Sequence, residues 1–190
     1  RRLGDQAGLE PITGLPDREA LAAEIAARSQ GVKGPIGWLA LVDLDYFFRV
    51  ADQHGRPAAQ ALLREAAQLI HSRLTPSSLA ASLADDRVAV LLPHSGSEVA
   101  VAWGEGTLAA IAEHAFVTAE QPTPLTASCG VTEVTAGESL DAVLVRAGRS
   151  LQLAKASGRN CVATSQEVER ETEAWAAYAA PVREALGIAD

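Results

Sequence analysis

Acidic residues occur in two short segments of this chain where they could hold a metal ion. Asp43 and Asp45 follow the apolar run 36–42, and Asp85 and Asp86 lie in a tight turn within 81–93, a stretch typical of two strands joined by a hairpin. Carboxylates that converge from two sheet loops are ligands that Mg²⁺ uses together with substrate phosphates, and two such ions can clamp an in-line displacement at phosphorus. Asp is also frequent in ordinary surface turns, so the hairpin taken alone indicates no more than a turn, and the upstream acids are what favour a metal site.

Two cations lie near the end of the last long helix that the sequence predicts. Lys155 and Arg159 flank the point, Gly158, at which that helix is expected to stop. A lysine and an arginine at one helix end are suited to binding phosphates, since both present N–H donors with positive charge. Acids and cations together indicate chemistry on a phosphorylated ligand.

The elements that must position these groups can be read from hydrophobic spacing. Helices are predicted at 18–29, 46–53, 58–74 and 97–114, and from Ser139 to Gly158, with Asp17 and Ser139 as N-caps and Gly104 and Gly106 as weak points. Strands are predicted at 36–42, in the hairpin, at 125–134 and at 161–163. A hairpin combined with helical crossovers predicts an α+β fold, with a mixed central sheet of about five strands flanked by helices.

The last segment, 164–190, differs from the rest of the chain. It has six acidic and two basic side chains, and a heptad-like stripe that runs from Val168 through Trp175 to Leu186. Pro181 is expected to kink or break this helix. The favoured interpretation is a terminal helix that lies back on the domain with Trp175 as its anchor. A dimer or interdomain contact is the alternative.

Composition excludes several classes of partner. The 190 residues carry a formal net charge of −8 and are 48% hydrophobic, enough for a sizeable core. Nucleic acids and anionic membrane surfaces require a basic footprint, so neither is an expected partner. No apolar run is long enough to span a membrane, and the chain begins with Arg1 where an initiator Met is absent. We therefore expect a cytoplasmic piece of a longer protein.

Four segments together resemble the GGDEF domain, the fold of the bacterial diguanylate cyclases, which join two GTP molecules into cyclic di-GMP. Residues 11–18 resemble its opening motif, with Glu10 in place of a leading Asp, and 41–48 resemble its metal-binding strand. Residues 83–88 occupy the signature loop, and 154–160 match the closing A-K-x-x-G-R-N. The resemblance covers about 10–163, so we expect a linker at 1–9, a GGDEF-like domain at 10–163 and, outside the resemblance, the acidic helical extension at 164–190.

The resemblance also assigns candidate site residues. It implies metal ligation by Asp43, the backbone carbonyl of Leu44 and Asp86, with Mg²⁺ or Mn²⁺ as the cofactor when a nucleotide is bound. Nucleotide contacts are implied for a second group, which comprises Phe47, Phe48, Lys155 and Arg159.

The chain departs from the family pattern at the positions that carry the chemistry. The signature reads Ala84, Asp85, Asp86, Arg87, Val88: both glycines are replaced, and Arg87 reverses the charge of the fourth position. Phe48 stands at the place of a phosphate-binding lysine. Ala51 and Gln60 stand at the places of two guanine contacts. The segment 75–78 lacks the R-x-x-D motif of the cyclic di-GMP inhibitory site. No catalytic residue is therefore expected.

These observations favour a degenerate, inactive GGDEF domain with a regulatory, binding or dimerisation role in cyclic di-GMP signalling. Its partners would be a second copy or other signalling domains. The alternative is a Mg²⁺-dependent domain that binds GTP or ATP weakly without cyclase activity. A third hypothesis is an active diguanylate cyclase with an unusual loop, and a fourth is a purely structural adaptor role for the tail, in which removal of 164–190 abolishes dimerisation but leaves the fold intact.

Overall fold

A computed structural model describes residues 8–83 and 86–186. The main sheet has five strands in the order β2-β3-β1-β6-β7. The strands are β1 (Pro35–Leu44), β2 (Leu79–Ser82), β3 (Arg87–Pro93), β6 (Ala127–Thr135) and β7 (Val162–Thr164). All pairs in this sheet are antiparallel except β6 with β7, which is parallel. The predicted mixed α+β fold is confirmed.

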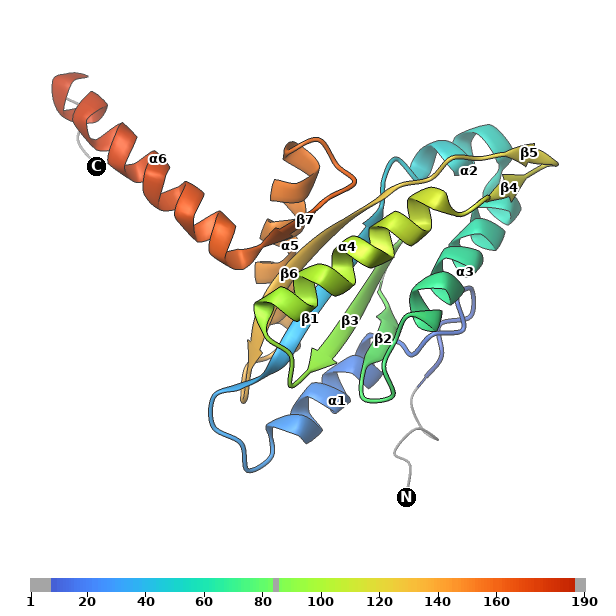
Figure 1. The fold of residues 1–190 in the computed structure, drawn as a ribbon, viewed down its shortest axis with the longest axis horizontal. Coiled ribbons are helices and arrows are strands. Elements are labelled where there is room, and N and C mark those ends of the chain that lie inside the picture. The colour runs from blue at the N-terminus through green and yellow to red at the C-terminus, as the bar shows by residue number, and fades with distance from the viewer. Residues whose placement is uncertain (1–7, 84–85, 187–190) are drawn as a thin grey trace.

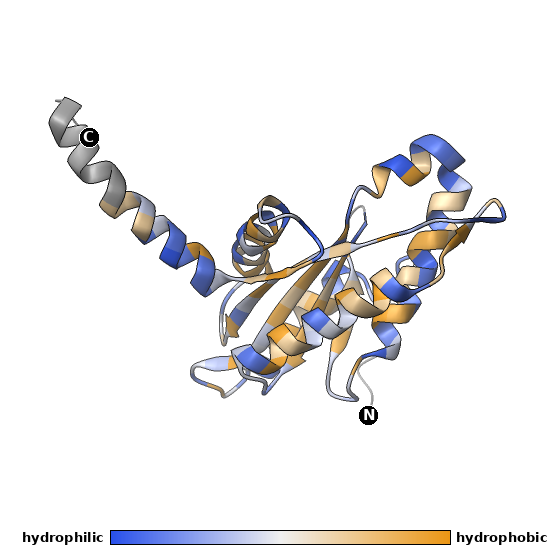
Figure 2. Ribbon diagram, turned by 45° about the horizontal axis from the view of Figure 1, so that its top comes forward, coloured by the Kyte–Doolittle hydropathy of each residue, from blue (hydrophilic) through white to orange (hydrophobic). Residues whose placement is uncertain are grey.

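Helices cover both faces of the sheet (Figure 1). One face packs on α1 (Arg18–Ser29) and α5 (Leu140–Ala156), and the other on α3 (Arg56–Ser72) and α4 (Ser97–Glu113). A short helix, α2 (Phe48–His54), joins β1 to α3, and the strands β4 (Val117–Thr118) and β5 (Gln121–Pro122) form a separate small hairpin. Apolar residues follow the strands and the inner helix faces, as Figure 2 shows. The core therefore lies in two layers, one on each side of the sheet.

Local signals place several helix ends where the sequence predicts them. The Asp17 carboxylate accepts a hydrogen bond from Ala20 N at 2.9 Å, and Ser139 Oγ accepts one from Ala142 N at 3.2 Å, so both predicted N-caps are confirmed. Gly55 ends α2 with a φ of 82°, a conformation that glycine adopts without strain, and α3 begins directly after it. This one-residue connection places α2 and α3 next to each other beside the end of β1.

Two expectations about interruptions are wrong. Asp43 does not stop β1, because Asp43 pairs with Arg87 on one side and Ser128 on the other, so the strand continues to Leu44. Gly104 and Gly106 do not weaken α4, which runs unbroken. A Cβ at Gly104 would lie 3.0 Å from a methyl group of Val162, so glycine there permits close helix–sheet packing.

The C-terminal helix α6 (Ser165–Leu186) begins directly at the end of β7. Thr164 and Glu167 form a reciprocal capping box: Thr164 N donates to Glu167 Oε2 at 2.7 Å, and Glu167 N donates to Thr164 Oγ1 at 3.2 Å. In addition, the hydroxyl groups of Thr132 and Ser165 lie 3.2 Å apart. The direction of α6 is therefore set by the sheet itself.

The prediction that this helix lies back on the domain is wrong. After its first turns, which contact α5, β6 and β7, α6 projects away from the body of the molecule (Figure 1). Trp175 is 68% exposed, so it does not anchor the helix in a core. The helix also continues through Pro181 without a break. None of the described helices is both long and apolar enough to cross a membrane.

Candidate functional site

A cavity of about 640 Å³ opens at the carboxyl end of β1. Its wall is built from the end of β1, the segment after it, the first turns of α3, the β2–β3 turn and the end of α5. Seven predicted site residues line it together: Asp43, Leu44, Phe47, Phe48, Asp86, Lys155 and Arg159. The structure thus brings the separate motifs to one place.

Two other signature residues, Arg87 and Val88, are described, and neither is among the residues that line the cavity. Arg87 is the first residue of β3 and stands opposite Asp43 in the strand register. Val88 is buried in the core between the sheet and α3. Ala84 and Asp85 fall outside the described residues.

Asp43 and Lys155 form an ion pair at the wall of the cavity. Lys155 Nζ donates to Asp43 Oδ1 at 2.5 Å, and the two side chains are 24% and 12% exposed. Lys155 lies in the last turn of α5, so this pair also ties α5 to the end of β1. A metal ion bound by this oxygen of Asp43 would have to displace the ammonium group.

The oxygen atoms in the cavity fit Mg²⁺ only when phosphates complete its shell. Asp43 and Asp86 line the same cavity, and the carbonyl of Leu44 accepts a long hydrogen bond from Phe47 N at 3.4 Å. Among the described residues, no group of three His, Cys, Asp or Glu side chains is arranged to hold a metal. Mg²⁺ commonly binds one or two carboxylates and takes its other ligands from phosphates and water, which agrees with this donor set.

Asp45 has a structural task that its sequence position does not reveal. Its buried carboxylate accepts hydrogen bonds from Thr126 Oγ1 and Ser128 Oγ, both at 2.8 Å, and from Asn160 N at 3.2 Å. These bonds join the end of β1 to β6 and to the turn after α5. Asp45 therefore fixes the turn that carries Arg159.

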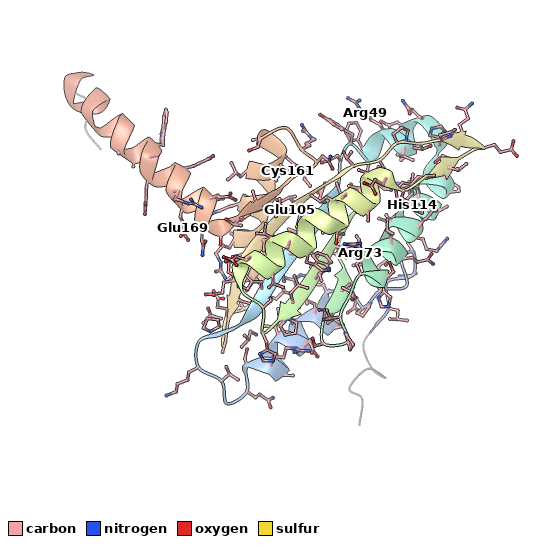
Figure 3. The ribbon with its side chains drawn as sticks, viewed as in Figure 1. Arg49, Arg73, Glu105, His114, Cys161 and Glu169 are labelled. Carbon is pink, nitrogen blue, oxygen red and sulfur yellow. The ribbon has the colours of Figure 1, made fainter. Side chains whose placement is uncertain are left out.

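The sequence did not predict a role for Tyr46 and Arg49 at the rim of the cavity. The guanidinium carbons of Arg159 and Arg49 lie 4.4 and 4.6 Å from the ring centre of Tyr46. Arg49 projects from α2 at the outer edge of the molecule (Figure 3). Two further polar side chains, Arg56 and Gln60, reach the cavity from α3. The contact of Arg159 with Tyr46 depends on how the turn after α5 meets β1, which a motif pattern could not indicate, whereas Arg49 contacts the ring from three residues further along the same segment.

Comparison with known proteins agrees with this arrangement. Residues 7–161 match the family described as diguanylate cyclase, GGDEF domain. The chain belongs to the GGDEF family. It is 33% identical over 154 residues to diguanylate cyclase DgcP of Pseudomonas aeruginosa, an alignment that covers 80% of this chain and 23% of DgcP. The chain thus spans about a quarter of that relative.

Solved structures of GGDEF proteins share the fold. Diguanylate cyclase SiaD of P. aeruginosa, solved in complex with its activator SiaC, has a TM-score of 0.76 and 28% identity, over 82% of this chain and 61% of SiaD. The GGDEF domain of DgcB from Caulobacter crescentus, solved in complex with c-di-GMP, has a TM-score of 0.77 over 87% of this chain and 98% of that one. At 24% identity, the second likeness shows the fold alone.

In this GGDEF domain, one part of the cavity lining is apolar. Ile12, Ala51, Ala59 and Leu63 line it beside the ring of Phe47. Such a surface can accept the flat face of a base, because apolar and aromatic side chains lose water readily. Gln60 and Arg56 are the polar side chains that α3 offers there.

Glu10, at the place of the family's leading Asp, holds the turn that positions Ile12. Its carboxylate accepts hydrogen bonds from Thr13 N at 2.7 Å, Ile12 N at 3.0 Å and Thr13 Oγ1 at 2.8 Å. Burial raises the pKa of Glu10, but these hydrogen bonds and the charge of Arg64 outweigh it, so the pKa lies below its ordinary value of 4.5. The ionised carboxylate therefore stabilises the folded state.

We expect Glu10→Gln to lower the melting temperature by about 2–4 °C at pH 7, through loss of about 1 kcal/mol. Because the folded-state pKa of Glu10 is lowered, its contribution is complete above about pH 4.5 and is lost as the pH falls through the lowered value. Melting curves from pH 7 to pH 2.5 should show the difference from wild type shrinking to zero. Glu113→Gln, at an exposed position on α4, is the control and should show little difference at any pH. A decrease in the melting temperature of Glu10→Gln that stays the same at every pH would contradict the prediction.

Proposed function

We propose that this chain is a catalytically inactive GGDEF domain with a regulatory role in cyclic di-GMP signalling, exerted by binding or by dimerisation. The observation that carries the proposal is Arg87, which replaces the fourth signature acid and stands opposite Asp43 in the sheet. A positive side chain beside the candidate metal carboxylate opposes the binding of metal ions. Phosphoryl transfer with paired metal ions depends on acids at such positions.

Other replacements in the same cavity support inactivity. Ala51 and Gln60, at the two positions where guanine contacts are implied, both line the cavity. Ala51 has no side-chain group that forms hydrogen bonds, so recognition of guanine loses selectivity. Phe48 is 62% exposed and uncharged where a phosphate-binding lysine is implied. Together, these replacements weaken contacts both to the guanine base and to the phosphates of GTP.

The test is direct measurement of product. The purified domain is incubated with GTP and either Mg²⁺ or Mn²⁺, and cyclic di-GMP is measured by chromatography. We expect no product above the level without protein, while the GGDEF domain of DgcP serves as the positive control. Sustained turnover that is lost in Asp43→Ala would overturn the proposal.

A second candidate function is nucleotide binding without cyclase activity. The specific observation in its favour is the cavity itself, whose volume of about 640 Å³ is within the range of ligand pockets. Asp43, Asp86, Lys155 and Arg159 line it with the charges that a metal–phosphate group requires. The apolar part of the lining accepts a base with little selectivity, so GTP and ATP should bind with similar affinity.

Titration calorimetry with GTP and ATP in Mg²⁺ tests this second function. Lys155→Ala should weaken both ligands by about tenfold or more, because it removes a positive charge from the cavity wall. Lys33→Ala is the matched control, since it removes the same charge from an exposed loop on another part of the domain. Absence of heat and of any thermal shift with wild type would rule out this function.

A further inference from the structure

Two arginine side chains meet on one aromatic ring at the rim of the cavity. The guanidinium carbon of Arg159 lies 4.4 Å, and that of Arg49 4.6 Å, from the ring centre of Tyr46, and Arg49 is also 5.9 Å from the ring centre of Phe48. Both rings line the cavity. These distances are within the range of cation–π contacts, so the ring of Tyr46 contacts both positive charges.

The backbone holds this arrangement in conformations that non-glycine residues rarely adopt. Tyr46 has a φ of 56°, Arg159 of 66° and Asn160 of 48°. Left-handed backbone at non-glycine residues is strained and persists only where surrounding contacts enforce it. The enforcing contact is the buried carboxylate of Asp45, which precedes Tyr46 and binds Asn160 N, the residue after Arg159. The carboxylate of Asp45 therefore fixes the positions of both the Tyr46 ring and the Arg159 guanidinium group.

Within residues 8–83 and 86–186, the stacked arginines keep their donors available. Among the described residues, no carboxylate forms a hydrogen bond or ion pair with Arg49 or Arg159, whereas Lys155 is already paired with Asp43. A guanidinium group that stacks on a ring leaves the N–H groups at its edge free for a planar or tetrahedral oxyanion. Two such groups beside one cavity form a site for the multiple negative charges of a polyphosphate.

We propose that Arg49, held on Tyr46 beside Arg159, forms a subsite for the terminal phosphates of a nucleoside triphosphate. This inference deepens the second function proposed above and rests on it. Arg49 contacts the ligand directly, and Tyr46 is a positioning residue. The subsite should favour triphosphates over monophosphates, because two guanidinium groups match the several negative charges of a polyphosphate better than those of a single phosphate.

The experiment compares GTP, GMP and inorganic tripolyphosphate by titration calorimetry. Arg49→Ala should weaken GTP and tripolyphosphate by about tenfold and leave GMP nearly unchanged. Arg170→Ala is the matched control, since it removes an exposed arginine from α6. Tyr46→Ala should reproduce the loss, while Tyr46→Phe, which keeps the ring, should bind as wild type does. This rescue separates positioning from the hydroxyl group, and if Tyr46→Ala does not fold, Arg49→Ala and Tyr46→Phe suffice.

The outcomes distinguish the subsite from the function on which it rests. If Arg49→Ala binds GTP and tripolyphosphate as tightly as Arg170→Ala does, the proposed subsite is wrong, but the proposed nucleotide-binding function is unaffected. If wild type binds tripolyphosphate through Arg49 but neither GTP nor ATP, the subsite is supported and the nucleotide function fails. If wild type binds none of these ligands, both are overturned.

Discussion

Asp45→Ala is expected to lower the free energy of unfolding by about 3 kcal/mol and to abolish binding of triphosphates. The substitution leaves the hydroxyl groups of Thr126 and Ser128 and the backbone N–H of Asn160 without their common acceptor. Each unsatisfied buried donor costs about 1–3 kcal/mol, and relaxation toward water recovers part of this. The turn that carries Arg159 also loses its anchor, so the rim of the cavity opens.

Urea unfolding measures the first effect and calorimetry with GTP the second. Asp52→Ala is the matched control, because Asp52 is exposed on the neighbouring helix α2, and it should change stability by less than about 0.5 kcal/mol. The stability of Asp45→Asn should fall between those of the two variants. Its amide keeps one oxygen that can accept a hydrogen bond, but its NH₂ group cannot accept one from the donors around it. Equal stability of Asp45→Ala and Asp52→Ala would show that Asp45 does not tie these segments together.

Gly130→Ala is expected to destabilise the domain by about 3 kcal/mol or more. A Cβ at this position in β6 would lie 2.3 Å from Ala147 O, 2.3 Å from Leu151 N and 2.9 Å from Leu151 Cα. All three are backbone atoms of α5, which cannot move aside as a flexible side chain can. The helix would have to shift as a unit, and Lys155 at its end would move away from Asp43.

Thermal and urea unfolding of Gly130→Ala should be compared with Gly148→Ala. Gly148 is inside α5, and a Cβ there would meet no atom within 4 Å. Alanine at an open position in a helix should raise stability by about 0.5–1 kcal/mol, so the two glycine variants should shift in opposite directions. A Gly130→Ala protein as stable as wild type would mean that α5 and β6 are less closely packed than the structure indicates.

Much of the fold could be predicted from local signals. Asp17 and Ser139 were identifiable as N-caps because a short polar side chain preceded an amphipathic run. The end of β1 was predicted wrongly, since an acid normally ends an apolar strand. Asp43 is tolerated inside the sheet because Lys155, far along the chain, neutralises it.

The candidate site was predicted in its composition but not in its contacts. Asp43, Asp86, Lys155 and Arg159 were expected together, and they line one cavity. Asp45 was expected beside Asp43 as an acid that could hold a metal, but its carboxylate instead binds Thr126, Ser128 and Asn160, and the role of Arg49 was not predicted. The direction of α6 was also predicted wrongly. An apolar stripe indicates that one face of a helix is suited to packing, but it does not indicate which surface packs against that face.

By itself, the sequence determined the family, the order of the elements and the set of charges that converge, because motifs and hydrophobic periodicity are local properties of a chain. Tertiary structure alone decided how those charges are used. The bond from Lys155 to Asp43 spans 112 positions and that from Ser128 to Asp45 spans 83, and no local pattern encodes such pairs. These long-range contacts pair Lys155 with Asp43 and anchor Asp45, and among the described residues they leave Arg49 and Arg159 without a carboxylate partner.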